Sequence, residues 1–160
     1  MTEARTGLPS ECPFCAIVAR QAPAAIVCED ADTLAFLDIH PVARGHTLVI
    51  PKTHIRTLLD LDDATGAALI RTVRIVANAL RAAGLAEGLN LLQSNEAVGG
   101  QDVFHVHFHL IPRKADDGIM GRPGQDRVFN WRVLREPRWE ELVRVASIVQ
   151  GVVRTVSQMP

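Results

Sequence analysis

The segment from Val103 to Ile111 alternates between polar and apolar residues, and this alternation constrains the fold more than any other feature. A β-strand turns successive side chains to opposite faces, so we expect His105, His107 and His109 on one face. Four apolar residues share the other face, which must be the core side: Phe104, Val106, Phe108 and Leu110. A slip of one residue would bury three imidazoles and expose those apolar groups, so the register is strongly specified.

The histidines of this segment indicate a functional site. The chain has six histidines, and three of them recur here at strict period two. A single histidine on a strand is usually a half-exposed polar residue, but three at this spacing are difficult to attribute to chance. Such a row can carry catalysis, bind a metal ion or combine both uses. The spacing alone leaves those alternatives open.

The length and charge of the chain limit its class. Its 160 residues fit one globular domain, with 48% hydrophobic and 22% charged residues. We expect a single domain over 1–160, with a flexible N-terminus at 1–11 and a loop and C-terminal helix at 114–160. The formal net charge is −1 and no long basic run is present. Generic binding of nucleic acid through a cationic face is therefore excluded.

The N-terminal stretch Met1–Cys12 lacks the apolar core of a signal peptide, and no later segment is long and apolar enough to span a bilayer. Three cysteines are present, two of them at the ends of the segment Cys12–Cys15, and they do not resemble a secreted disulfide framework. In a reducing compartment such a pair more often binds metal or carries redox chemistry. These features predict a cytoplasmic protein with no membrane partner.

Four segments have the composition of strands. Thr33–Leu37 and His46–Ile50 are rich in strand-forming residues and are separated by a turn, which predicts an antiparallel pair. Leu89–Ser94 and Val103–Arg113 are expected as two further strands around a polar loop. Before them, Cys15–Arg20 can form a short helical turn that carries the cysteine pair.

Two segments have helical periodicity. The first helix can be capped by Asp62 or Asp63, and Gly84 lies where a C-terminal glycine belongs. The second begins after Pro137, a favourable first-turn residue. Strands, one long helix, more strands and a terminal helix predict an α+β fold with an antiparallel sheet. The apolar positions of the two helices are Leu69, Val73, Val76 and Leu80, then Trp139, Leu142, Val143, Ala146, Val149 and Val153.

The segment Gly99–Arg113, with the sequence GGQDVFHVHFHLIPR, resembles the signature of the histidine triad (HIT) family. The likeness extends upstream to Phe36–Asp38, Gly45–Lys52 and His54, and covers roughly residues 12–113. The resemblance implies a HIT-like α+β fold, a homodimer in which two sheets join, and a nucleotidyl hydrolase or transferase that acts at the α-phosphate of a nucleotide.

By position in the motif, the resemblance makes His107 the nucleophile. It would attack phosphorus, expel the leaving group and form a transient nucleotidyl-histidine. This chemistry requires a neutral imidazole whose other nitrogen is held by a backbone carbonyl or a similar acceptor. His109 could contact the phosphate oxygens or the leaving group, where an imidazolium would offset developing negative charge.

The resemblance also implies a pocket for a purine nucleotide or dinucleotide. Asp38 matches the acid that accepts hydrogen bonds from both ribose hydroxyls, although a strand-end aspartate is also a common turn former. Phe14, Ile17 and Phe36 match apolar positions that sandwich the base, although each alone is more often a core residue.

The loop before the histidine segment is a candidate phosphate site. Gly99 and Gly100 would let backbone amides approach a phosphate, although two glycines also suit an ordinary turn. The resemblance places Gly100, Gln101 and Ser94 near the phosphates, with Asn95 as the alternative to Ser94.

Asp102 departs from the family pattern, which commonly has Thr or Ser at this position. An ionised carboxylate cannot donate a hydrogen bond and would repel a phosphate. We expect that Asp102 either points away or shifts the leaving-group preference, for example towards a cationic amine.

The spacing of Cys12 and Cys15 is that of a zinc-binding pair, and zinc needs two further nitrogen or sulfur ligands. The resemblance supplies His54 and His105, which predicts a closed structural zinc site distant from the reaction. A thiol–disulfide pair or two plain cysteines are the alternatives, but redox chemistry would want a βαβ context. Cys28 is expected to be buried or to lie at a strand edge. His40 and His46 are expected to be structural or exposed.

The leading functional hypothesis is therefore a nucleotide phosphoramidase or dinucleoside polyphosphate hydrolase. The second is a phosphorylase, in which inorganic phosphate resolves the nucleotidyl-histidine in place of water. The third is a zinc-stabilised nucleotide-binding protein whose catalysis is vestigial.

Overall fold

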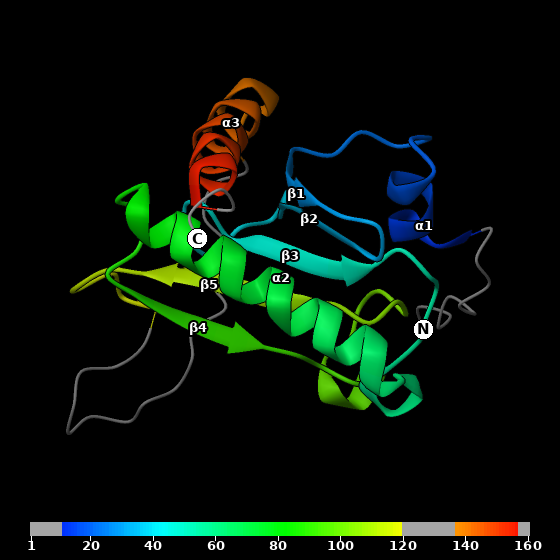
Figure 1. The fold of residues 1–160 in the computed structure, drawn as a ribbon. Helices are drawn as coiled ribbons and strands as arrows, with labels where there is room; N and C mark the ends of the chain where they lie inside the picture. The colour runs from blue at the N-terminus through cyan, green and yellow to red at the C-terminus, as the bar shows by residue number, and fades with distance from the viewer. Residues whose placement is uncertain (1–10, 120–136, 157–160) are drawn as a thin grey trace.

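The computed structural model describes residues 11–119 and 137–156 (Figure 1). The expected α+β fold is confirmed: five antiparallel strands form one sheet in the order β1-β2-β3-β5-β4. The expected flexible N-terminus lies outside the described residues apart from Glu11, as does most of the expected loop after Arg113. The strands are β1 (Ile26–Glu29), β2 (Thr33–Leu37), β3 (Thr47–Pro51), β4 (Gly88–Leu92) and β5 (Phe108–Arg113). The helices are α1 (Pro13–Val18), α2 (Asp63–Ala82) and α3 (Trp139–Val156), with short 3-10 turns η2 (Leu58–Asp60) and η3 (Ala97–Gly99).

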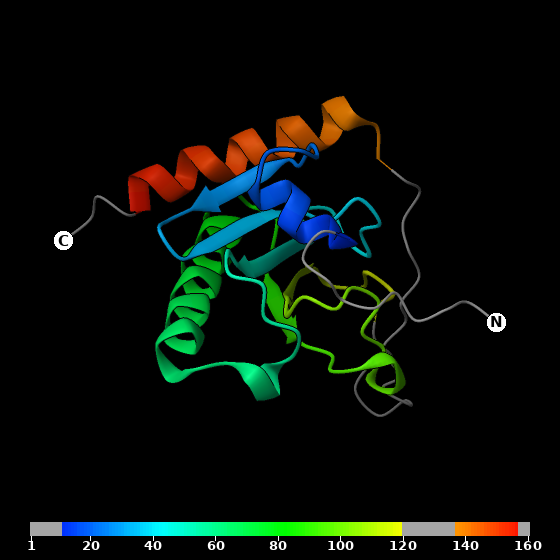
Figure 2. The same ribbon diagram turned by 90° about the vertical axis from the view of Figure 1, so that its right-hand side faces the viewer.

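The sheet has helices on both faces, and its alternating side chains pack in two separate apolar clusters. Ala35, Leu37 and Val49 point towards α2 and α3, where they join the larger apolar cluster. Leu34 and Ile50 point the other way and join the cluster beneath α1. Figure 2 shows the sheet between α2 and α1. The period-two pattern of β2 and β3 therefore explains both layers.

The ends of α2 follow from local sequence chemistry. The Asp62 carboxylate accepts a hydrogen bond from the Thr65 amide at 2.8 Å, which makes Asp62 the N-cap. At the other end Gly84 has a φ of +70° and follows the C-cap residue Ala83. The cap at Asp62 and the terminal glycine are both confirmed. In the described part of the chain, no helix has the length and apolar character to cross a membrane.

The sequence prediction was wrong at two places in the sheet. Strand β1 was not expected; it is only four residues long and lies at the sheet edge. Strand β5 begins at Phe108, whereas a strand from Val103 was expected. The histidine segment departs from the ladder because the His105 amide donates to the Val103 carbonyl at 2.9 Å and the Val106 amide donates to Ile55 at 2.7 Å.

This irregular segment also changes the predicted division into a polar and an apolar face. Val106, Phe108 and Leu110 are buried as expected, but Phe104 is only half-buried. His105 and His107 are buried as deeply, with exposed fractions of 0% and 5%. The polar face is therefore covered, and each imidazole needs an internal hydrogen-bond partner.

Gly45 allows the β2–β3 connection to approach α2 and β5 closely. Its φ is +88°, and a Cβ added there would lie 3.1 Å from Leu80 Cδ2 and 3.4 Å from Pro112 Cγ.

We expect Gly45→Ala to lower the free energy of unfolding by about 1–3 kcal/mol through strain and crowding. Gly66→Ala is the matched control, because it lies in α2 with no heavy atom within 4 Å of the new Cβ. It should raise stability by up to about 1 kcal/mol. Urea unfolding followed by circular dichroism would contradict this account if both variants changed stability equally.

Candidate functional site

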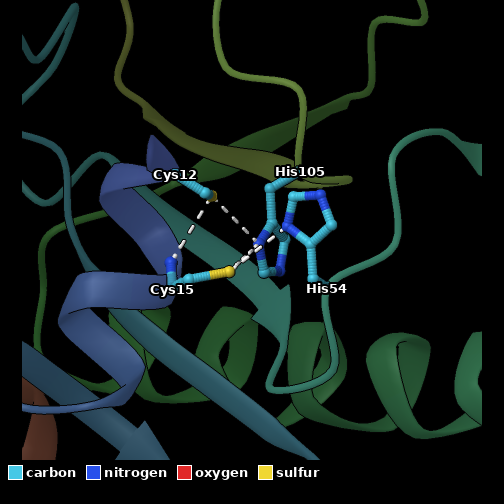
Figure 3. Close-up of side chains that lie close together, drawn as sticks. All are labelled: Cys12, Cys15, His54 and His105. Carbon is cyan, nitrogen blue, oxygen red and sulfur yellow. Dashed lines mark hydrogen bonds between the residues drawn. The ribbon is translucent and has the colours of Figure 1, made fainter. Parts of the chain in front are cut away.

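Four side chains with metal-binding atoms converge beside α1 (Figure 3). Cys12 Sγ lies 3.4 Å from His105 Nδ1, and Cys15 Sγ lies 3.2 Å from His54 Nδ1 and 3.6 Å from His105 Nδ1. All four ligand atoms lie within 4.8 Å of one another. The structure therefore brings together all the residues predicted to bind metal, from α1, the segment after β3 and the segment before β5.

The geometry and chemistry of this cluster fit zinc. Tetrahedral zinc with sulfur and nitrogen ligands separates the ligand atoms by about 3.3–3.8 Å, which matches the distances between the sulfurs and the imidazole nitrogens. Burial, opposed by a hydrogen bond to Pro51, lowers the pKa of His105 to about 4, so its ring is neutral at pH 7. Its Nε2–H donates to the Pro51 carbonyl at 2.9 Å, which leaves Nδ1 facing the sulfurs.

The surroundings of Cys15 favour its neutral thiol over its thiolate. Burial, together with the neighbouring sulfur of Cys12, raises the pKa of the Cys15 thiol to about 11. A divalent cation would reverse this effect by stabilising the thiolate. The described part of the chain therefore holds a donor set that a metal ion would complete.

His107 is oriented by the backbone of the metal cluster. Its Nδ1–H donates to the carbonyl oxygen of His105 at 2.7 Å, so the lone pair of the ring lies on Nε2. Burial, opposed by that hydrogen bond and by the charges of Asp38 and Asp102, lowers the pKa of His107. The ring is therefore neutral at pH 7, with its lone pair available on Nε2. The Phe14 ring contacts it edge to face, with 5.2 Å between the ring centroids.

The predicted metal site was expected to be distant from the reaction, but it lies directly beside His107, the predicted nucleophile. His105 offers its side chain to the metal cluster and its carbonyl oxygen to His107. In addition, α1 carries Cys15 and Phe14 and has Cys12 as its N-cap. The Phe14 ring also contacts His105, at 5.9 Å between centroids. The two sites share one helix and one histidine.

His46 is the site residue that sequence reasoning missed. It was expected to be structural or exposed, but it is 1% exposed and its Nε2 lies 3.0 Å from His109 Nδ1. The Val42 amide donates to His46 Nδ1 at 3.3 Å, so the ring hydrogen of His46 lies on Nε2. His46 Nε2–H then donates to His109 Nδ1, so the ring hydrogen of His109 lies on its Nε2. The available signal was the position of His46 within the matched stretch Gly45–Lys52.

His109 differs from the expected imidazolium. Burial and the neighbouring charges of His107 and His46 lower its pKa to about 3, so it is neutral in the free protein. The rings of His107 and His109 lie 4.9 Å apart between centroids. Two positive charges at that separation would repel, and burial removes the water that would screen them.

Asp38 faces the same histidines. Its Oδ2 lies 3.6 Å from His46 Nδ1 and 4.0 Å from His109 Nδ1. Its Oδ1 accepts a hydrogen bond from the His40 amide at 2.8 Å, so Asp38 also forms the strand-end turn that was its alternative role. Asp38 and His46 line a pocket between the β2–β3 connection and α3.

The three apolar residues predicted to contact a base lie together. Phe14 and Phe36 are buried in the cluster beneath α1, and Ile17 is half-buried against it. The two phenyl rings contact each other edge to face at 5.5 Å between centroids. Through Phe14 this cluster adjoins His107.

The loop before the histidine segment differs from the expected phosphate cradle. The amides of Gly99, Gly100 and Gln101 already donate to the carbonyls of Glu96 or Ala97, at 2.9–3.0 Å. Gly100 has a φ of +86° and ends η3, so the glycines form a turn, the alternative considered from the sequence.

Polar side chains hold this loop in shape. Asn95 Oδ1 accepts from the Leu58 amide at 2.8 Å. The Gln101 side chain makes three hydrogen bonds to backbone groups of the loop and its neighbours. Ser94 Oγ lies 3.9 Å from the position of a Cβ on Gly100. Asp102 is exposed, and its charge partly opposes the burial that lowers the pKa of His107.

Comparison with known proteins gives this geometry a family. A model of the HIT domain matches residues 19–116. An adenosine 5′-monophosphoramidase of Schizosaccharomyces pombe is 40% identical over 110 residues, which cover 69% of this chain and 80% of that protein. An adenylylsulfatase of Arabidopsis thaliana is 39% identical over 110 residues, which cover 69% of this chain and 56% of that protein. The crystal structure of a zinc-bound histidine triad family protein from Mycobacterium smegmatis has a TM-score of 0.78 and 34% identity, and the match covers 94% of this chain and 98% of that one. The chain therefore belongs to the histidine triad (HIT) family.

Proposed function

We propose that this protein is a nucleotide phosphoramidase or dinucleoside polyphosphate hydrolase that attacks an α-phosphate through a nucleotidyl-histidine on His107. The observation that carries the proposal is the hydrogen bond from His107 Nδ1 to the His105 carbonyl, because it leaves Nε2 as the attacking atom. The names of the fission yeast and Arabidopsis relatives support hydrolysis at a nucleotide phosphorus.

The reaction has two displacements. Nε2 of His107 bonds to phosphorus while the bond to the leaving group breaks, and the leaving group departs with that electron pair. Water then bonds to phosphorus while the bond from phosphorus to Nε2 breaks, and its electron pair returns to the His107 ring. The water gives up a proton to solvent, and the nucleoside monophosphate leaves. His109 lies beside His107 and carries its hydrogen on Nε2, which suits donation to a phosphate oxygen.

The substrate is a purine nucleotide or dinucleotide. The Asp38 carboxylate, which faces His46 and His109, would accept hydrogen bonds from the ribose hydroxyls. Phe14, Ile17 and Phe36 would contact the base from the cluster beside His107. Four residues of the loop would contact or shape the phosphate site: Ser94, Asn95, Gly100 and Gln101.

Two further features complete the proposal. Zinc is the metal for the cluster of two cysteines and two histidines, and its chemistry there is to hold the four ligands and neutralise the thiolates. The assembly is a homodimer joined at β4, an edge strand on which Leu91 is 43% exposed. A net charge of −1 argues against nucleic acid as a partner.

Removing the nucleophile tests the reaction. We expect His107→Ala to lower turnover of adenosine 5′-phosphoramidate at least about 1,000-fold, because the covalent route is lost. Mass spectrometry after acid quenching should find an adenylyl group on His107 in the wild type alone. His40→Ala is the matched control, an exposed histidine outside the proposed machinery.

Two results would contradict the proposal: unchanged turnover in the His107 variant, or nucleotide binding without turnover in the wild type, which indicates vestigial catalysis. A nucleoside diphosphate product in the presence of inorganic phosphate would identify a phosphorylase.

The metal proposal predicts a stoichiometry and a loss of stability. Elemental analysis of the purified protein should find about one zinc per chain, and Cys15→Ser should retain little of it. The Tm of Cys15→Ser should fall by several degrees, because a ligand bound only to the folded state stabilises that state and this variant loses it. Cys28→Ser is the control, since Cys28 lies on β1 outside the cluster. Equal zinc content in the two variants would exclude this site.

Asp102 predicts a preference for cationic leaving groups. Two kcat/KM values would be measured, one for a nucleoside phosphoramidate with a cationic amine and one for a dinucleoside polyphosphate. In Asp102→Ser the ratio of the first to the second should fall about fivefold. The effect should shrink in high salt. Asp32→Ser makes the same charge change at an exposed turn and should leave the ratio unaltered. An unchanged ratio in Asp102→Ser would show that this carboxylate takes no part in leaving-group choice.

A further inference from the structure

The carbonyl that orients His107 belongs to a part of the chain outside the strand ladder. Pairing of β5 with β3 begins at Phe108, opposite Val49, so Val103–His107 has no strand partner in that register. The Val106 amide instead donates to the carbonyl of Ile55 at 2.7 Å. The position of the His105 carbonyl therefore depends on contacts with the segment that follows β3.

Gln101 makes the first of these contacts. Its side chain is only 2% exposed and joins three pieces of backbone. Its Nε2 donates to the carbonyls of Arg56 at 2.8 Å and Val103 at 3.1 Å, and its Oε1 accepts from the Glu96 amide at 2.7 Å. Residue 56 is thus linked to the start of the histidine segment through its backbone.

The Arg56 side chain makes a second connection between the loop and the histidine segment. Its Nε and Nη2 donate to the two carboxylate oxygens of Glu96 at 3.1 and 2.7 Å. Its guanidinium carbon lies 4.1 Å from the centroid of the Phe104 ring, a cation–π contact directly before His105. One side chain therefore touches both the loop and the histidine segment.

Glu96 holds a backbone conformation that needs support. Its φ is 61° and its ψ is 162°, a region that side-chain-bearing residues rarely adopt. Its amide is fixed by Gln101 and its carboxylate by Arg56. A strained residue persists only where its surroundings hold it, and here those surroundings are the two links just described.

We propose that Arg56 is a positioning residue for the reaction on His107, acting through Glu96 and Phe104. Arg56 bonds to Glu96 and packs on Phe104, and these contacts fix the backbone next to His105. The His105 carbonyl of that backbone accepts the Nδ1–H of His107. This inference rests on the proposed function, because it assigns Arg56 to the geometry of that same nucleophile.

The chain offers a control ion pair without this task, and its side chains are more buried, at 16% and 17% exposed against 43% and 47% for Arg56 and Glu96. Arg113 and Asp117 form an equally bidentate pair, at 2.7 and 2.8 Å, at the opposite end of β5 from the histidines. If Arg56–Glu96 served only to stabilise the fold, breaking it would lower stability, as breaking Arg113–Asp117 would, and would leave the orientation of His107 unchanged.

The test compares Arg56→Gln with Asp117→Asn and with the conservative Arg56→Lys, all as zinc-loaded full chains. Arg56→Gln should lower kcat for adenosine 5′-phosphoramidate about tenfold with KM changed less than about twofold, since misplacement affects attack more than binding. Hydrogen exchange of the Val106 amide should accelerate about tenfold. The ¹⁵N signature of a protonated Nδ1 on His107 should weaken. Arg56→Lys should recover part of each change, and Asp117→Asn should show none.

The inference is overturned if Arg56→Gln and Asp117→Asn match in kcat, Val106 exchange and the His107 signal. Failure of the proposed function has a different signature. In that case wild-type protein shows no turnover, while Val106 exchange and the His107 nitrogen signal still respond to Arg56→Gln. Loss of those two responses alone contradicts the role of Arg56.

Discussion

The hydrogen bond from His107 to the carbonyl of His105 is the interaction on which the rest of the site depends. A buried imidazole has to be neutral and must satisfy its N–H inside the protein, and here one backbone acceptor meets both needs. The same bond selects the tautomer and so leaves the lone pair of the ring on Nε2. Because the acceptor belongs to a residue of the metal cluster, a shift in that cluster moves the acceptor as well.

That coupling gives α1 a larger part than its six residues suggest. A helix of this length is unstable alone in water, so its position is set by what it docks against. Phe14 docks it into the apolar cluster, while Cys12 and Cys15 face His54 and His105. Two of the four candidate metal ligands and the edge-on contact to His107 thus lie on one small element and its N-cap. Its placement orders the wall of the site as one unit.

The sequence predicted the parts of this site that local patterns encode. Asp62 and Gly84 were recognisable because caps depend on neighbouring residues, and period two identified Phe108 and Leu110 as core. The irregular course of Val103–His107 was not predictable, because bonds to Ile55 and Arg56 replace the ladder there. The metal residues were found through the cysteine spacing together with the family resemblance.

His46 shows what sheet register adds to such patterns. Leu48 pairs with His109 across β3 and β5, so His46, two residues earlier, shares that face and lies diagonally next to His109. A slip of one residue would turn His46 towards α2 and leave His109 without this partner. The three neighbouring imidazoles, His46, His107 and His109, are tolerated in a buried site because none is charged. An anion placed beside these rings would raise their pKa values, because a negative charge favours the protonated form of an imidazole.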